Sequence, residues 1–272
     1  MSEVRRLVRP HASIAFEDSG GDGEAVVVCH GAGMDRTMYE SQTTALTDAG
    51  LRVIAWDLAG HGESTLSGAS RFAASDALED LTALLDECAV DRAVLVGHSL
   101  GGNLAQAFVR AHPHRATGLI VLDSTWNAGP LAWWERLALR LAAPSLALVP
   151  ARSLPGLMAR ASAVSADAIE RTEATFARMP KSVFLDVWRA TVSFVDPDPA
   201  YRTPVPLALV RGALDRTGNI ASAMPRWART EGIAEHVVPD AGHIVTWDAP
   251  DATSRVLLGV LEEWRTAAPD GA

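Results

Sequence analysis

The stretch of sequence that decides the fold is Ala93–Gly102, which reads AVLVGHSLGG. An apolar run typical of a strand ends at Gly97, and a small-residue pattern typical of a helix begins just after Ser99. A serine on such a sharp strand-to-helix turn has a strained backbone, so its neighbours two positions away must lack side chains. Gly97 and Gly101 meet this need, and the arrangement is that of a nucleophile elbow. The stretch therefore predicts that Ser99 is a nucleophile presented at the edge of a sheet.

The composition narrows the class of protein. The chain has 272 residues, 48% of them hydrophobic, and a net charge of −9, which suits one large α/β domain carrying an insertion. The acidic balance and the lack of a Lys/Arg cluster argue against a nucleic-acid partner. Cys29 and Cys88 lie in no metal-ligand spacing, so we expect no metal and no cofactor. The start of the chain has no apolar signal region and the apolar run around 137–149 is too short to span a bilayer, so we expect a cytoplasmic protein without a membrane partner.

Strands and helices alternate along the first part of the chain. Ala25–Cys29 and Leu51–Trp56 are continuous apolar runs, as in strands buried on both faces. Between the second of these runs and the elbow, Phe72–Ala89 carries apolar residues at helical spacing. After the elbow helix, Gly118–Leu122 is another strand pattern. This order predicts a parallel sheet with right-handed crossovers.

The alternation stops after residue 125. From 126 to 203 the sequence shows helical patterns, several prolines and no convincing strand, and strand pattern resumes at Pro206–Val210. An insertion of this length is too long for a single crossover helix. We therefore predict a doubly wound, mostly parallel α/β core formed by 1–125 and 204–272, with 126–203 as a helical lid.

Several short motifs along the chain together resemble the α/β-hydrolase superfamily over essentially its whole length. The motifs that carry the resemblance are, in chain order, His30-Gly31, Asp57-x-x-Gly-His-Gly-x-Ser64, Gly97-His-Ser-Leu-Gly-Gly102, Gly212-x-x-Asp215 and Ala241-Gly-His243. Their order Ser, Asp, His is the order of the catalytic triad in that fold. The resemblance implies a hydrolase of the α/β-hydrolase fold.

A serine hydroxyl needs a base within hydrogen-bond reach, and the base needs a carboxylate that fixes its tautomer. His243 follows a short strand and can approach Ser99 from the same sheet edge, so we predict it as the base. Asp215 occupies the position after the penultimate strand where the resembling family has its acid. Asp123, at the end of the strand after the elbow, is the alternative acid, because some members of the fold carry the carboxylate there. Asp57 is interpreted as structural, since in the family pattern it organises the following Gly-His-Gly turn.

The intermediate of acyl transfer also needs two hydrogen-bond donors aimed at its oxyanion. One is the backbone N–H of Leu100, directly after the nucleophile. The resemblance implies that the other is the backbone N–H of Ala32. Met34 and Trp126 are candidates for the wall of the substrate pocket, and the tryptophans of the predicted lid suit either a pocket or the lid's own small core.

The leading hypothesis is a serine hydrolase that acts on a small apolar ester, lactone or related acyl compound through an acyl-enzyme. The same triad would also serve a C–C bond hydrolase or a cofactor-free haloperoxidase or perhydrolase. A third hypothesis is a non-catalytic receptor that retains the fold. Fold-level resemblance leaves the natural substrate and the oligomeric state open.

Overall fold

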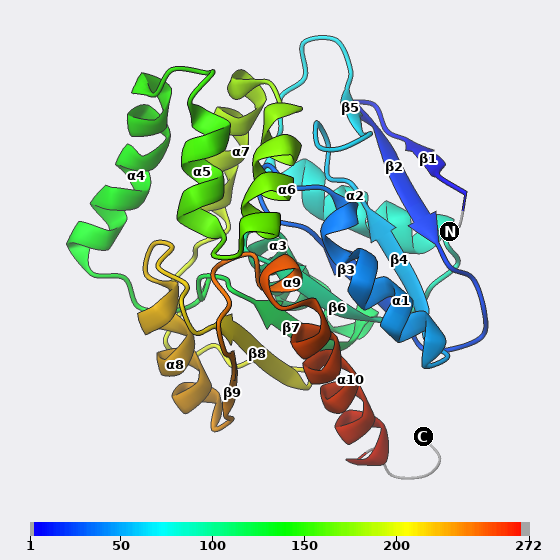
Figure 1. Ribbon diagram of the computed structural model, residues 1–272. Helices are drawn as coiled ribbons and strands as arrows, with labels where there is room; N and C mark the ends of the chain where they lie inside the picture. The colour runs from blue at the N-terminus through cyan, green and yellow to red at the C-terminus, as the bar shows by residue number, and fades with distance from the viewer. Residues whose placement is uncertain (1–2, 268–272) are drawn as a thin grey trace.

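The structure is a computed structural model, and it describes residues 3–267. Within these residues, nine strands form one sheet (Figure 1). The strands are β1 (Arg5–Val8), β2 (Ala12–Asp18), β3 (Ala25–Cys29), β4 (Arg52–Trp56), β5 (Thr65–Leu66), β6 (Ala93–His98), β7 (Ala116–Leu122), β8 (Leu207–Gly212) and β9 (Glu235–Val238).

The strand order across the sheet is β1-β2-β4-β3-β6-β7-β8-β9, with β5 beside β2. All neighbours from β4 to β9 are parallel, whereas β1, β2 and β5 form antiparallel pairs at one edge. The prediction of a doubly wound, mostly parallel α/β sheet is confirmed. The sequence does not predict β1 or β5, because both are short and carry exposed residues instead of a buried apolar run.

Helices cover both faces of the sheet and form the insertion between β7 and β8. They are η1 (Arg36–Tyr39), α1 (Glu40–Asp48), α2 (Ala74–Glu87), α3 (Leu100–Ala111), η2 (Pro113–Arg115), α4 (Trp133–Leu148), α5 (Leu154–Ser162), α6 (Ala166–Ala177), α7 (Lys181–Ser193), α8 (Ile220–Glu231), α9 (Val245–Asp248) and α10 (Pro250–Ala267).

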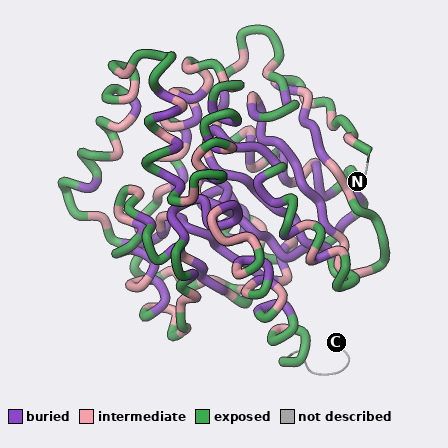
Figure 2. Tube along the Cα trace, viewed as in Figure 1, coloured by how far each residue is buried: buried purple, intermediate pink, exposed green. Residues whose placement is uncertain are grey.

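The central strands are buried along nearly their whole length, and each contributes side chains to two hydrophobic cores, one on either face of the sheet (Figure 2). Val27 points to the core that contains Leu104 of α3 and Trp227 of α8. Its neighbour Val28 points to the opposite core, with Leu257 of α10. The alternation follows from the two-residue period of a strand. It explains why these strands are continuous apolar runs and not alternating ones.

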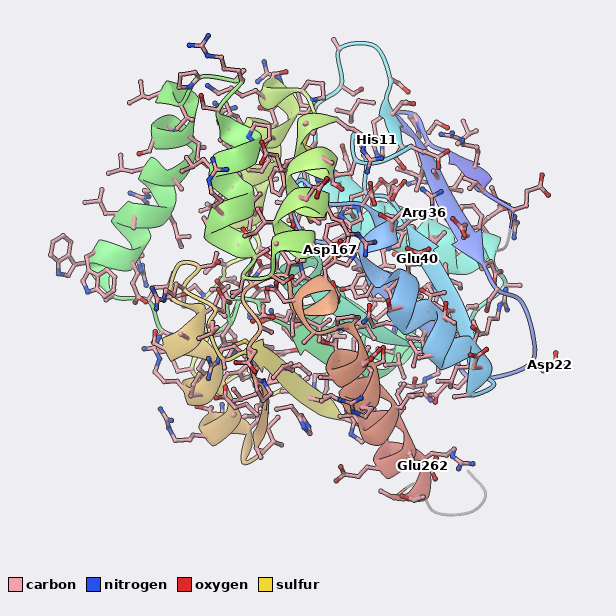
Figure 3. The ribbon with its side chains drawn as sticks, viewed as in Figure 1. His11, Asp22, Arg36, Glu40, Asp167 and Glu262 are labelled. Atoms are coloured by element: carbon pink, nitrogen blue, oxygen red, sulfur yellow. The ribbon has the colours of Figure 1, made fainter. Side chains whose placement is uncertain are left out.

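Helices α4 to α7 gather on one side of the molecule, beyond the carboxyl ends of the parallel strands (Figure 1). They occupy the segment 126–203 that the sequence predicts to be a lid, and we call this segment the helical insertion. Helix α6 contacts α1 through Arg171, whose guanidinium lies 3.6 Å from the Glu40 carboxylate. Figure 3 labels Glu40 and Asp167 in this region. The insertion therefore rests on the core next to the loop that follows β3.

Candidate active site

Ser99 lies between β6 and α3 in a backbone conformation that non-glycine residues rarely adopt, with φ 51° and ψ −115°. A Cβ at Gly97 would overlap the carbonyl group of Gly101, and a Cβ at Gly101 would overlap the carbonyl of Cys29. Both glycines are therefore required by close backbone approach, as the sequence argument predicted. The backbone of Ser99 is fixed by its own N–H, which donates to Leu122 O at 3.0 Å. Such a tightly held strained turn is a common feature of reactive sites.

His243 and Asp215 lie in loops that follow neighbouring strands, β9 and β8, and their side chains meet. His243 Nδ1 donates to Asp215 Oδ2 at 3.1 Å, and both side chains are buried. The N–H of Thr217 donates to the other oxygen of the same carboxylate at 2.7 Å. Burial opposes ionisation of Asp215, but the attraction of His243 and these hydrogen bonds outweigh it and lower its pKa to about 2. The pair thus has the form of a base oriented by an ionised acid.

Asp123 lies beside this pair without bonding to the histidine. It is fully buried, has φ 41°, and its Oδ1 accepts the N–H of Gly212 at 2.8 Å. Burial and the nearby Asp215 charge raise the pKa of Asp123 well above its usual value. Of the two candidate acids, the structure brings Asp215 to His243 and leaves Asp123 buried beside the pair.

These three residues also form a compact potential ligand set. In residues 3–267, Asp123, Asp215 and His243 are the one group of His, Cys, Asp or Glu side chains whose possible ligand atoms all lie within 4.8 Å of one another. The hydrogen bond between His243 and Asp215 already uses one atom of each. The cluster is therefore the acid–base group itself and not a separate candidate metal centre.

The loop after β3 lies directly against the elbow. A Cβ at Gly31 would lie 3.4 Å from the Cβ of Ser99, and Ala32 is the next residue along this loop. Gly33 has φ +76° and packs against the ring of Phe176 on α6, where any side chain would overlap it. Leu100 is the first residue of α3, where backbone N–H groups have no partner within the helix. The structure thus brings both predicted oxyanion donors to the neighbourhood of Ser99.

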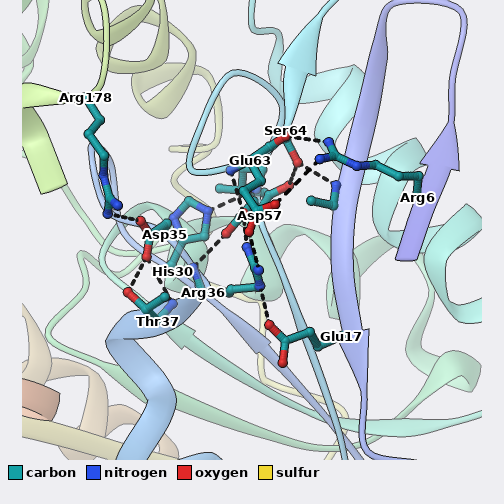
Figure 4. A network of polar contacts seen from close by, with 12 residues as sticks. Arg6, Glu17, His30, Asp35, Arg36, Thr37, Asp57, Glu63, Ser64 and Arg178 are labelled. Atoms are coloured by element: carbon teal, nitrogen blue, oxygen red, sulfur yellow. Dashed lines mark hydrogen bonds and ion pairs between the residues drawn. The ribbon is translucent and has the colours of Figure 1, made fainter. Parts of the chain in front are cut away.

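A polar network fixes this loop to the turn after β4 (Figure 4). Asp57 accepts the N–H of Glu63 at 2.9 Å and the N–H of Arg36 at 2.7 Å, and its Oδ2 pairs with the Arg36 guanidinium at 2.6 Å. His30 Nε2 accepts the N–H of Leu58 at 2.9 Å. The network explains the Asp57-x-x-Gly-His-Gly-x-Ser pattern as a scaffold for the loop that carries Ala32.

Ser99 lines a cavity of about 420 Å³ between the core and the helical insertion. The remaining lining residues come from α3, from the loop after β7, from the insertion, and from the start of α8 and the segment before it: Asn103, Thr125, Trp134, Glu135, Ala138, Leu139, Ala142, Trp188, Thr191, Val195, Thr217, Gly218, Asn219, Ile220 and Ser222. Two of the insertion's tryptophans, Trp134 and Trp188, therefore face the nucleophile's cavity. The sequence could not select them, because helical spacing is the same for a core and for a pocket wall.

The two residues named from sequence as pocket candidates lie elsewhere. Met34 is buried in the core beneath the loop after β3. Trp126 stacks on Trp227, with ring centroids 6.0 Å apart, and lines a separate cavity of about 950 Å³ that does not include Ser99. Neither side chain lines the cavity beside Ser99. Met34 and Trp126 follow strand ends in the sequence, but this position alone does not decide which cavity or core their side chains enter.

Comparisons with known proteins agree with this geometry. Residues 26–256 match the model of the alpha/beta hydrolase family. A protein of Mycobacterium phage D29 named as a non-heme haloperoxidase is 35% identical over 108 residues, which is 38% of this chain and 37% of that protein. The carbamate hydrolase RutD of Variovorax paradoxus is 28% identical over 91% of this chain and 94% of its own length. The structure of a thermophilic esterase from Thermogutta terrifontis superposes with a TM-score of 0.77 at 26% identity, covering 97% of this chain and 99% of that one.

Within the described residues, no helix is both long and apolar enough to cross a membrane.

Proposed function

Because the chain belongs to the alpha/beta hydrolase family, we propose that it is a serine hydrolase that cleaves a small carboxylic ester, lactone or related acyl compound. One observation carries the proposal: His243 Nδ1 bonds Asp215 Oδ2 at 3.1 Å, next to a strained serine turn. A histidine oriented by a carboxylate supports general-base activation of Ser99.

In the proposed reaction, His243 Nε2 takes the proton of Ser99 Oγ as that oxygen bonds to the acyl carbon. The N–H groups of Leu100 and Ala32 stabilise the resulting oxyanion. When the tetrahedral species collapses, the C–O bond of the ester breaks and the alcohol leaves with the proton held by His243. Water then attacks the acyl-enzyme by the same steps, which releases the acid and restores Ser99.

The cavity supports a small substrate. At about 420 Å³ it has the size of sites that enclose small organic molecules, and much of its wall is apolar. The similarity to an esterase over nearly the whole chain supports ester cleavage. We propose that the helical insertion acts as a lid, because Trp134 and Trp188 of this segment form part of the wall of the cavity that Ser99 lines.

The test is turnover and covalent labelling by purified protein. Wild type is expected to hydrolyse p-nitrophenyl esters of short acids and to be labelled by a fluorophosphonate, whereas Ser99→Ala is expected to lose both. Ser41→Ala, at an exposed position on α1, is the matched control and should keep both. Labelling of Ser99→Ala at the wild-type rate, or no labelling and no turnover by wild type, would refute the proposal. The second result would favour a non-catalytic receptor.

Perhydrolysis is the second candidate, favoured by the similarity of 38% of the chain to the phage protein named as a haloperoxidase. It would use the same acyl-enzyme, with hydrogen peroxide in place of water as the attacking molecule. Adding hydrogen peroxide to an ester assay and measuring peracid separates the two reactions. A peracid yield below the background of the Ser99→Ala variant would exclude the second candidate.

A further inference from the structure

The cavity beside Ser99 has two chemically different walls. One is apolar and is formed largely by Trp134, Leu139 and Trp188 of the helical insertion. The other is polar and contains Thr125, Glu135 and Asn219. An acyl pocket that served only to exclude water would not need the second wall.

Glu135 is the charged member of the polar wall. It lies in the first turn of α4 and is only 7% exposed. Its Oε2 accepts the N–H of Ala132 at 2.7 Å, and its Oε1 accepts the side-chain N–H of Asn219 at 2.8 Å. Both donors are neutral. In residues 3–267 no Lys, Arg or His forms an ion pair with Glu135.

A buried carboxylate with only neutral partners is an unusual feature. Burial of an ionised group is costly unless an opposite charge or several hydrogen bonds compensate. A carboxylate offers about four acceptor positions, and the bonds to Ala132 and Asn219 use two of them. Because Glu135 also lines the cavity, its remaining acceptor capacity is available to a molecule bound there.

The position of Glu135 is fixed from the core as well as from the insertion. Asn219 precedes α8 as its N-cap residue, and its Oδ1 accepts the hydroxyl of Thr125 at 3.4 Å. Ser124, the residue directly before Thr125, donates its hydroxyl hydrogen to the backbone carbonyl of Ser99 at 2.7 Å. A continuous set of contacts therefore runs from the nucleophile's turn through Thr125 and Asn219 to Glu135.

From these contacts we propose that Glu135 selects esters that carry an ammonium group remote from the reacting carbonyl, on either the acyl or the alcohol part. The proposal rests on the serine-hydrolase function above and names the substrate class of that site. The apolar wall would hold the methylene chain, while the ammonium group would complete the hydrogen bonding of the buried carboxylate. The net charge of −9 also favours the approach of a cationic substrate over an anionic one.

The experiment uses pairs of esters that differ only by an ammonium or a methyl group at the chain end. Ethyl 6-aminohexanoate against ethyl heptanoate places the charge on the acyl part, and 6-aminohexyl butyrate against heptyl butyrate places it on the alcohol part. In one of the two pairs, wild type is expected to prefer the ammonium ester by about 10-fold or more in kcat/KM, the effect of one charge-assisted contact. Glu135→Gln should abolish that preference, because glutamine keeps an acceptor for the N–H of Ala132 but carries no charge. Glu170→Gln, which removes an exposed charge from α6, should leave the preference intact.

The outcomes separate this proposal from a merely structural role for Glu135 and from failure of the hydrolase function. If Glu135→Gln changes both members of each pair equally, or wild type prefers the methyl ester in both pairs, Glu135 only caps α4 and the proposal is wrong. Calorimetric binding of hexylammonium gives a readout that needs no turnover. Weaker binding to Glu135→Gln than to wild type would support the proposal even if no ester were cleaved, and equal or absent binding would overturn it. Failure of the hydrolase function would instead appear as no fluorophosphonate labelling of Ser99.

Discussion

The imidazole of His98, the residue directly before Ser99, donates from Nε2 to the backbone carbonyl of His243 at 2.7 Å. The two rings also lie against each other, with centroids 4.7 Å apart. A carbonyl oxygen only accepts, so Nε2 of His98 carries a hydrogen. Burial lowers the pKa of His98 to about 3, which keeps the ring neutral at ordinary working pH. The residue beside the nucleophile thus holds the loop of the proposed base.

Removing this bond should impair catalysis by misplacing the base. We expect His98→Leu to lower kcat by about 10-fold or more, because small errors in the position of a catalytic group are costly. His98→Gln keeps an amide donor for the His243 carbonyl and should stay within about 3-fold of wild type. Steady-state kinetics on a p-nitrophenyl ester, with circular dichroism to confirm folding, check the prediction. Equal losses in the leucine and glutamine variants would show that the bond does not position His243.

The same histidine should make the fold sensitive to acid. In the unfolded chain a histidine binds a proton near pH 6.5, whereas the folded His98 binds one only near pH 3. The folded pKa is lowered, so the unfolded state binds more protons between these values. Stability that is present above about pH 6.5 is therefore lost as pH falls toward 3, by about 1.4 kcal/mol per pH unit for one group.

Urea unfolding at pH 7 and pH 5 measures this loss. The unfolding free energy should decrease less between the two pH values for His98→Gln than for wild type. The difference should be up to about 1.4 kcal/mol for each pH unit below 6.5. His114→Gln, at an exposed histidine of η2, should leave the decrease unchanged. If His98→Gln shows the same pH dependence as wild type, the buried ring is not the group that titrates.

The two buried carboxyl groups next to His243 should respond differently to amidation. Asp215→Asn removes the charge that stabilises the imidazolium and should lower kcat by about 10³-fold or more. Asp123 has no hydrogen bond to His243, and burial and the Asp215 charge raise the pKa of Asp123 well above its usual value, so Asp123→Asn should cost less than about 10-fold. Comparing kcat of the two variants decides the acid. Loss of turnover in Asp123→Asn alone would assign that role to Asp123.

The parts of this site that could be predicted from sequence are those set by local backbone demands. Ser99 needs glycines two positions away, and a base on a strand-end loop such as His243 arrives at the same sheet edge in any parallel α/β fold. The bond between His98 and His243 joins residues 145 positions apart and depends on how two loops pack, which no periodicity encodes. The sequence does not identify Glu135 as a site residue for a similar reason. A glutamate in the first turn of a helix is typical of capping, and only the packing of the insertion on the core turns it into a cavity wall.

Close backbone approach at Gly101 gives a prediction on stability. A Cβ there would overlap the carbonyls of Cys29 and His30, so β3 and α3 would have to move apart. We expect Gly101→Ala to destabilise the protein by about 2 kcal/mol or more, in the range of overpacked cores. Gly259→Ala, in α10 with no atom within 4 Å of the new methyl group, should instead stabilise by up to about 1 kcal/mol. Thermal unfolding of both variants measures the contrast, and a neutral Gly101→Ala would show that the two elements can separate without cost.

The network around Arg36 gives a final prediction, because its guanidinium is buried among three carboxylates. It lies 2.6 Å from Asp57, 2.8 Å from Glu17 and 2.6 Å from Glu63. Replacing it by methionine keeps much of its apolar volume but leaves the fully buried Asp57 without a cation, so we expect a loss of about 3–5 kcal/mol.

Urea unfolding provides the measurement, with Arg265→Met as the matched control. Arg265 pairs with Glu262 on the surface of α10, and its removal should cost less than about 1 kcal/mol. Adding Asp57→Asn to Arg36→Met removes the uncompensated charge and should recover part of the loss. If the double variant is no more stable than Arg36→Met alone, the penalty comes from lost packing and not from the buried carboxylate.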